Sequence, residues 1–239
     1  MSLFQFQFLH LFDIIIEQMA FKTADSYNNK SGDKHLKNTT GMIEGRLPKT
    51  LGQNGATVSI DKTAIWRQNG RIHRDNLPAV LKQNGEKVWW NKGLVDRSDG
   101  PAIEYPDGTR VWIRRNMFHR EGGPAIEWAD GSKEWFRNGD RHREGGPAYE
   151  GSDGSSAWWL DGSYHREDGP AIEYPDGTRV WFLHGVVHRE GGPALELPDG
   201  TVAWLSNGEL HREDGYAFVG PDGIGEHWLH GKRQDAPRQ

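Results

Sequence analysis

The chain of 239 residues contains no cysteine, which excludes disulfide bridges, thiolate nucleophiles and metal sites built on sulfur ligands. It also lacks a strong charge of one sign, because 29 Lys and Arg stand against 34 Asp and Glu, for a net charge of −5. This balance argues against nucleic-acid binding, which needs a basic surface to neutralise phosphates. Hydrophobic residues make up only 35% of the sequence. A globular enzyme of this length would normally have longer apolar helical stretches.

Glycine and tryptophan are abundant instead, with 31 and 11 residues, and the chain repeats itself every 23 residues. A Pro-Ala pair begins at Pro78, Pro101, Pro124, Pro147, Pro170 and Pro193, with Tyr216 at the next such position. Histidines follow the same step at His119, His142, His165, His188 and His211, with His73 earlier and Asp96 between. These series predict an array of seven to eight units over residues 51–233.

The unit that begins at Gly169 has the pattern of a β-hairpin. Asp176-Gly177 fits a two-residue type I′ turn, in which both central residues need positive φ. Branched and aromatic residues on either side predict strands over residues 172–174 and 178–182. His184-Gly185 is expected to end the second strand. One hairpin per unit predicts an all-β fold, an elongated single-layer antiparallel sheet of tandem hairpins after a short non-repeat segment.

The same turn predicts which side chains share a face. Pairing outward from Asp107-Gly108 places Ile103 opposite Trp112 and Glu104 opposite Val111, so each pair is expected on its own face. Tryptophan recurs at one position of the unit, and burying such a ring contributes roughly 2–3 kcal/mol. We therefore expect a structural repeat core of Trp66, Trp89, Trp112, Trp135, Trp158, Trp181, Trp204 and, after a one-residue insertion, Trp228.

The repeat resembles the MORN repeat in its length, its Pro-Asp-Gly turn, its aromatic second strand and its Asn-Gly followed by His. The resemblance covers about three quarters of the chain and is closer to the MORN-like variant of bacterial and phage proteins, some of them antitoxin-like. His165 to Ala171 departs from the commoner His-Gly-x-Gly, which weakens the case for lipid binding. The resemblance implies a scaffold or binding surface, sometimes at membranes, and an inhibitor or antitoxin-type role.

The residues before the array have a different character. Residues 1–21 form an apolar N-terminal segment, with Phe4, Phe6 and Phe8 among them, but its apolar stretch over residues 1–16 is shorter than the ~20 residues of a spanning helix. No basic residue precedes it, so it is a poor secretory signal and we expect a cytoplasmic protein. Residues 1–16 have three interpretations: a segment that docks on the array or a partner, a membrane-surface anchor, or residues upstream of a start at Met19.

Three further segments complete the predicted organisation. Residues 22–50 are polar and predict a flexible linker. Residues 51–62 have the pattern of a degenerate half-unit that caps the edge of the sheet. Residues 234–239 form a C-terminal tail.

The histidine series is the obvious candidate for metal binding or catalysis. Equivalent residues of successive units lie two strands apart, roughly 9.6 Å, whereas a zinc ligand lies about 2.0–2.1 Å from its ion. Two histidines of the series therefore cannot share one metal ion. His165, Arg166 and Glu167 are expected instead to order their own loop through hydrogen bonds and an ion pair.

Carboxylates form the second candidate set. Glu104, Glu127, Glu150, Glu173 and Glu196 share one position, but identical neighbours provide no asymmetry to make one an acid and another a base. We expect a solvated acidic stripe. Each Asp-Gly turn supplies one carboxylate, well short of the six or more oxygen ligands of calcium. No catalytic residue, metal or cofactor is therefore predicted.

The sequence predicts a non-enzymatic repeat protein that binds a macromolecule along one sheet face, and we expect this partner to be a protein. Specificity is expected where units differ, at the position after the recurring Trp and at the two positions before each His. Large side chains gather there in the central units, and such anchors dominate interface energies. The candidate contacts are Trp90, Met117, Phe118, Phe136, Trp159, Tyr164 and Phe182.

Two other function classes stay open. One is a membrane-associated scaffold attached through residues 1–16. The other is a carbohydrate- or choline-binding module that uses exposed indoles such as Trp90, Trp128 and Trp159.

Overall fold

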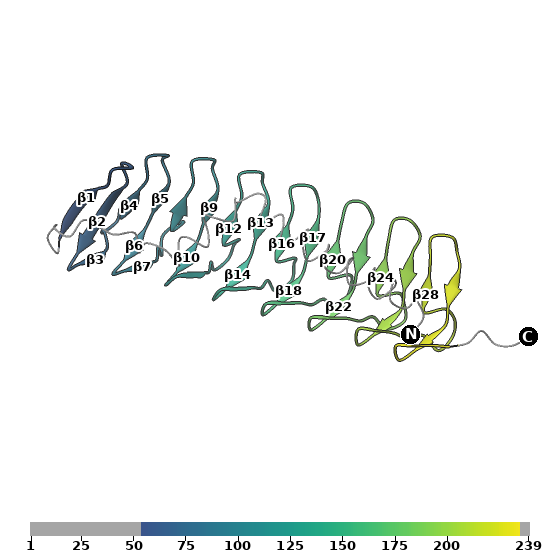
Figure 1. The fold of residues 1–239 in the computed structure, drawn as a ribbon. Coiled ribbons are helices and arrows are strands. Elements are labelled where there is room, and N and C mark those ends of the chain that lie inside the picture. Colours follow the sequence, from purple (N-terminus) through teal and green to yellow (C-terminus); the bar gives the residue numbers. More distant parts are fainter. Residues whose placement is uncertain (1–53, 235–239) are drawn as a thin grey trace, which may run out of the picture. The chain divides into compact units, whose positions relative to one another are not determined.

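The computed structural model describes residues 54–234. The predictions for the apolar segment, for the linker and for the tail beyond Gln234 lie outside these residues. The described part contains strands, turns and loops and no helix, so it has no helix that could cross a membrane. The prediction of an all-β array of tandem hairpins is confirmed (Figure 1).

Seventeen strands form one long sheet, in which all pairs are antiparallel. Sixteen of them lie side by side in the order β1 (Gly55–Val58), β2 (Ala64–Gln68), β4 (Val80–Leu81), β5 (Lys87–Val88), β8 (Ile103–Glu104), β9 (Arg110–Val111), β12 (Ile126–Glu127), β13 (Lys133–Glu134), β16 (Tyr149–Glu150), β17 (Ser156–Ala157), β20 (Ile172–Glu173), β21 (Arg179–Val180), β24 (Leu195–Glu196), β25 (Val202–Ala203), β28 (Phe218–Val219) and β29 (Gly225–Glu226). The seventeenth, β3 (Arg71–Ile72), pairs with the end of β2.

Seven two-stranded ribbons complete the fold. They pair β6 (Trp90–Asn91) with β7 (Leu94–Val95), β10 (Ile113–Arg114) with β11 (Met117–Phe118), β14 (Phe136–Arg137) with β15 (Asp140–Arg141), β18 (Trp159–Leu160) with β19 (Ser163–Tyr164), β22 (Phe182–Leu183) with β23 (Val186–Val187), β26 (Leu205–Ser206) with β27 (Glu209–Leu210), and β30 (Trp228–Leu229) with β31 (Lys232–Arg233).

Each unit therefore contains two hairpins, where the sequence predicted one. The recurring Trp is the residue at which the chain leaves the long sheet and enters the ribbon. Counted from the Pro position, the units are residues 55–77, 78–100, 101–123, 124–146, 147–169, 170–192, 193–215 and 216–234. The first is a complete unit and not the degenerate half-unit expected, because Asp61-Lys62 makes the same turn as Asp-Gly, with Lys62 at φ 60°.

The Asp-Gly turn of the first hairpin differs from the predicted two-residue turn. The Gly108 N–H donates to the Tyr105 carbonyl and the Tyr105 N–H to the Thr109 carbonyl, which encloses a three-residue loop. Pro106 and Asp107 form a type I turn, and only Gly108 has positive φ, at 98°. The Asp107 carboxylate accepts the Thr109 N–H at 2.8 Å.

The extra loop residue shifts the register by one and corrects the predicted faces. Ile103 pairs with Val111, not with Trp112, and both are fully buried. Glu104 pairs with Arg110 on the opposite face. A shift of one residue exchanges the two faces of a strand, which is why the turn length determines the core.

The two-residue type I′ turn occurs in the second hairpin instead. His184 and Gly185 have φ of 49° and 80°, and Phe182 pairs with Val187 around them. Asn-Gly, Asp-Gly, Lys-Gly and His-Gly occupy this turn in seven units, and Arg115-Asn116 in the third. Asn and Asp tolerate this backbone, and Gly adopts it without steric cost.

The hydrophobic core lies where the two hairpins of each unit meet. Val111 of the long sheet and Ile113 of the ribbon belong to one buried cluster. The alanine of each Pro-Ala pair is fully buried, and its carbonyl accepts the N–H of the preceding unit's Trp, as Ala102 does from Trp89 at 2.8 Å. Packing and hydrogen bonds thus join each unit to the next, as expected for a repeat array.

The last unit departs from the pattern without an insertion. His227 occupies the Trp position, and its carbonyl accepts the Gln234 N–H as Trp204 accepts that of His211. Trp228 is therefore the residue after the Trp position, corresponding to Leu205 in the seventh unit. At the edge strand, the ring of Tyr216 covers Gly225 and lies 4.5 Å from the His227 ring.

Candidate binding surface

The arginine after each histidine stacks on the recurring tryptophan of its own unit. The Arg120 guanidinium lies 3.7 Å from the centroid of Trp112 and donates to the Pro124 carbonyl at 3.0 Å and to Glu127 at 2.7 Å. The same stacking joins Arg74 to Trp66, Arg97 to Trp89, Arg143 to Trp135, Arg166 to Trp158, Arg189 to Trp181 and Arg212 to Trp204. The glutamate series is thus ion-paired and half-buried, and it is not the solvated acidic stripe expected.

This stacking also bears on how deeply the tryptophans of the predicted repeat core are buried. Trp181 and Trp228 are 9% and 5% exposed, and the other six are half-buried. A ring that carries a guanidinium on one face takes part in a cation–π contact and is not enclosed by apolar side chains alone.

The histidines join consecutive units. The Nδ1 of His165 accepts the N–H of His184 in the next unit's turn at 3.2 Å. His73, His119, His142, His188 and His211 do the same 19 residues along the chain. An accepting Nδ1 requires a neutral ring with its proton on Nε2. The histidines therefore connect neighbouring units, and the ion pair expected within the loop joins Arg166 to Asp168, at 2.8 Å, rather than to Glu167.

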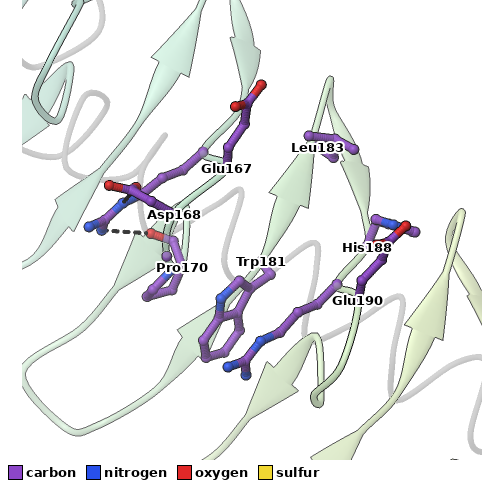
Figure 2. A pocket seen from close by; sticks show the side chains of 10 residues that line it. Glu167, Asp168, Pro170, Trp181, Leu183, His188 and Glu190 are labelled. Atoms are coloured by element: carbon purple, nitrogen blue, oxygen red, sulfur yellow. Dashed lines mark hydrogen bonds and ion pairs between the residues drawn. The ribbon is translucent and has the colours of Figure 1, made fainter.

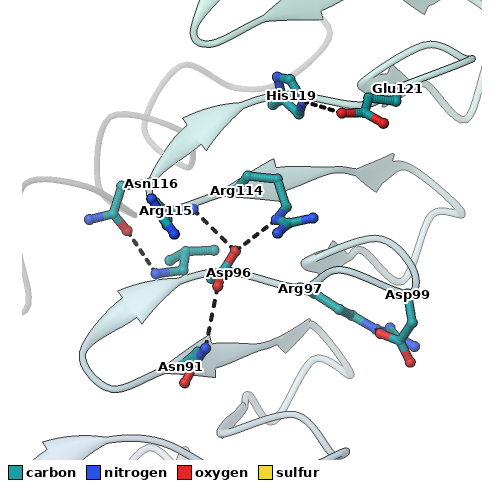
Figure 3. A network of polar contacts seen from close by, with 10 residues as sticks. Asn91, Asp96, Arg97, Asp99, Arg114, Arg115, Asn116, His119 and Glu121 are labelled. Carbon is teal, nitrogen blue, oxygen red and sulfur yellow. Dashed lines mark hydrogen bonds and ion pairs between the residues drawn. The ribbon is translucent and has the colours of Figure 1, made fainter.

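Asp96 replaces histidine in the second unit and makes the equivalent bond. Its Oδ1 accepts the Arg115 N–H at 3.2 Å and the Arg114 Nε at 3.1 Å, and its Oδ2 accepts the Asn91 amide (Figure 3). The Oδ1 of Asn116 accepts a further bond from the Val95 N–H at 2.7 Å. A carboxylate thus serves in the same role as a neutral imidazole.

A groove of about 670 Å³ lies between two neighbouring His-Arg-Glu loops. Figure 2 shows Trp181 between the loop that carries Glu167 and Asp168 and the loop that carries Glu190. The pKa of the Asp168 carboxyl is lowered by its hydrogen bond to Arg166 and by that cation's charge. His188 already accepts a hydrogen bond from Asn207. No group of three or more possible metal ligands occurs in residues 54–234.

The predicted contact residues are mostly inside the molecule. Phe136, Trp159 and Phe182 are 8%, 6% and 7% exposed. Trp90, Phe118 and Tyr164 are half-buried, and Met117 is exposed. Rings of neighbouring units contact each other there: the centroids of Phe118 and Phe136 are 5.1 Å apart, and those of Tyr164 and Phe182 are 5.0 Å apart. Six of the seven side chains therefore line the ribbon core.

The side chains that are both exposed and variable form another series, which we call the tip row. It is the first of the two positions before each His, directly after the type I′ turn of each second hairpin. All eight members are exposed and no two are the same residue type: Arg71, Leu94, Met117, Asp140, Ser163, Val186, Glu209 and Lys232. In six of the seven steps along the row, a Cβ added at the turn glycine directly before one member would lie 3.4–4.0 Å from the preceding member, so neighbouring members lie close together.

A buried ion pair was missed at the sequence level. Glu134 is 1% exposed and accepts Nε and Nη2 of Arg141 at 2.9 and 2.8 Å, and the Trp128 indole at 2.9 Å. Val111 and Phe118 occupy the same two positions of the preceding unit. The last unit repeats the pair as Glu226 and Arg233, 3.3 Å apart. The signal in the sequence that could have revealed this ion pair is the recurrence of Glu and Arg, seven residues apart, at the same two positions of two units.

The fold and these contacts define the chain as a tandem β-hairpin repeat protein. No protein-family model matches it, and no curated protein matches its sequence.

Proposed function

We propose that this chain is a non-enzymatic repeat protein that binds a protein partner along the tip row. The observation that carries the proposal is the presence of eight different, exposed side chains at one position of eight similar units. A repeated frame with a variable outer position is how repeat proteins form extended recognition surfaces. Three members, Leu94, Met117 and Val186, are apolar and about 40% exposed.

The contacts of the recurring polar residues support a role without catalysis. The arginine, glutamate and histidine series each serve packing within a unit or hydrogen bonding to the next. A catalytic site needs groups that converge on a substrate with distinct roles. Here equivalent groups lie along the array in equivalent surroundings.

The MORN-like character and a bacterial or phage inhibitor role belong to this proposal. They are supported by the repeat length and the turn residues of the sequence. We also propose a cytoplasmic location, since a chain without cysteine gains nothing from an oxidising compartment.

The test is affinity capture from the native host with the full chain and two variants. L94E/M117E/V186E changes three exposed apolar residues of the tip row, and V58E/I60E/I224E changes three exposed apolar residues outside it. We expect a protein that the wild type and the second variant capture and the first does not. Equal capture by both variants would contradict the placement on the tip row.

Two direct assays address the alternatives. Sedimentation with lipid vesicles that depends on residues 1–16, with no captured protein, would favour the membrane scaffold. A change of Trp fluorescence with a glycan or choline, again without a captured protein, would favour the carbohydrate- or choline-binding module.

A further inference from the structure

We propose that the tip row's first three units bind an acidic protein segment that also carries apolar side chains. The inference rests on the proposed function and names the chemistry of the partner. The surface, which we call the basic tip patch, consists of Arg71, Lys92, Leu94, Arg115 and Met117.

The cations of this patch have no carboxylate partner within residues 54–234. The side chains of Arg71, Lys92 and Arg115 form no ion pair or hydrogen bond there, and the backbone nitrogens of Lys92 and Arg115 donate to His73 and Asp96. Figure 3 shows the contact of Arg115 with Asp96. By contrast, the nearby Arg114 and Arg137 are paired with Asp96 and Asp161 at 3.1 and 2.7 Å. The patch thus carries three uncompensated positive charges.

The backbone at two of these cations is unusual. Lys92 and Arg115 each have φ of 50° at the first position of a type I′ turn. The other six units place Asn, Asp or His there, residues that are more common in this conformation. A long cationic side chain is less favourable at this position than Asn, so its presence in two consecutive units calls for a role outside the turn.

The apolar members lie beside the charges. Leu94 and Met117 are 40% and 43% exposed, and both follow the turns that carry Lys92 and Arg115. Arg71 lies against the second unit of the array, residues 78–100, since a Cβ added at Gly93 would be 3.8 Å from the Arg71 side chain. A surface of uncompensated cations around partly exposed apolar groups is complementary to a segment with carboxylates around an apolar anchor.

The charge of the following units favours a protein segment over a membrane or a nucleic acid. Asp140 and Glu209 are exposed at the tip-row position of the fourth and seventh units and form no ion pair in residues 54–234. A flat anionic bilayer or a long polyphosphate lying along the row would contact these carboxylates and be repelled. A short acidic segment that covers three units avoids them.

The experiment selects random twelve-residue display peptides for binding to the full chain. Binding of the selected peptides is then compared with variants whose new residues occur at the same position in other units. K92N/R115N and K92D/R115D introduce residues that other units have in that turn, and L94S/M117S introduces the residue of Ser163. K62D/K133D is the matched control, because both lysines are exposed and form no ion pair in the described part.

We expect the wild type and K62D/K133D to enrich peptides in which Asp or Glu flank an apolar residue. Affinity for these peptides should fall about tenfold in K92N/R115N and further in K92D/R115D, and should weaken with salt. L94S/M117S should weaken binding without changing its salt dependence. Circular dichroism checks that each variant is folded.

The following outcomes would overturn the inference. Enriched peptides without acidic residues, or peptides that bind K92D/R115D as well as wild type, would refute the basic tip patch and leave the proposed function standing. Binding to phosphatidylserine vesicles or to an oligonucleotide, without acidic peptides, would assign the patch to another ligand. If the wild type enriches no peptide relative to any of the variants, the result would count against the proposed function itself.

Discussion

The Arg166 guanidinium lies 3.9 Å from the ring centroid of Trp158, eight residues earlier in the chain. Nη1 of this guanidinium donates to the Pro170 carbonyl at 3.2 Å and to the Glu173 carboxylate at 3.0 Å. One side chain therefore connects the first hairpin of its unit, the loop after the second hairpin and the first strand of the next unit. It provides a cation–π contact and hydrogen bonds at once.

Replacing this arginine should destabilise the array locally. R166M keeps an apolar stem but removes the charge and the hydrogen bonds, so we expect a loss of about 2 kcal/mol. Amide hydrogen exchange in the fifth and sixth units measures it without assuming that the array unfolds in one step. The control is R179M, because Arg179 is half-exposed and its only ion pair in residues 54–234 is with Glu196 at 3.5 Å. Equal losses in both variants would contradict the structural role.

The buried Glu134–Arg141 pair gives a double-mutant cycle with a natural reference. E134V or R141F alone leaves one charge buried without its partner and should cost about 3 kcal/mol. E134V/R141F has the Val and Phe of the preceding unit and should regain most or all of this stability. Urea unfolding of the four proteins gives the coupling. Additive losses would mean that the two side chains do not depend on each other.

The bond from histidine to the next turn should be replaceable by aspartate. H188A removes the acceptor of the Asn207 N–H, with an expected cost of about 1 kcal/mol and faster exchange of that amide. H188D should keep the amide protected, because Asp96 accepts the equivalent Arg115 N–H at 3.2 Å. If both variants exchange equally fast, the bond is not what protects the amide.

Tyr174 should make stability depend on alkaline pH. Burial raises the pKa of its phenol well above the ordinary value of 10.0, because the folded protein disfavours phenolate. The raised pKa gives stability that is complete below pH 10 and is lost as the pH rises toward the folded-state value. Ultraviolet titration of phenolate should show one fewer late-titrating tyrosine in Y174F. A Y174F protein with unchanged alkaline stability would contradict this.

Much of the architecture follows from the repeat. The 23-residue period, the turn residues and the Pro-Ala pairs predict a β-hairpin array, and the array is observed. The register does not follow, since Pro106-Asp107-Gly108 can be read with a two- or a three-residue loop. The second hairpin was missed because residues 178–182 were read as one strand, whereas β21 ends at Val180 and Phe182 begins a new pair of strands around His184-Gly185.

The amino-acid sequence by itself determined that this protein is built from repeated paired strands, because turn residues and strand-forming residues act locally and recur at a fixed step. Only the tertiary structure decided which variable side chains are exposed. Phe182 and Val186 both vary between units, but the ribbon packs Phe182 against Tyr164 and leaves Val186 in solvent. That difference depends on how neighbouring units pack, and no local pattern in the sequence encodes it.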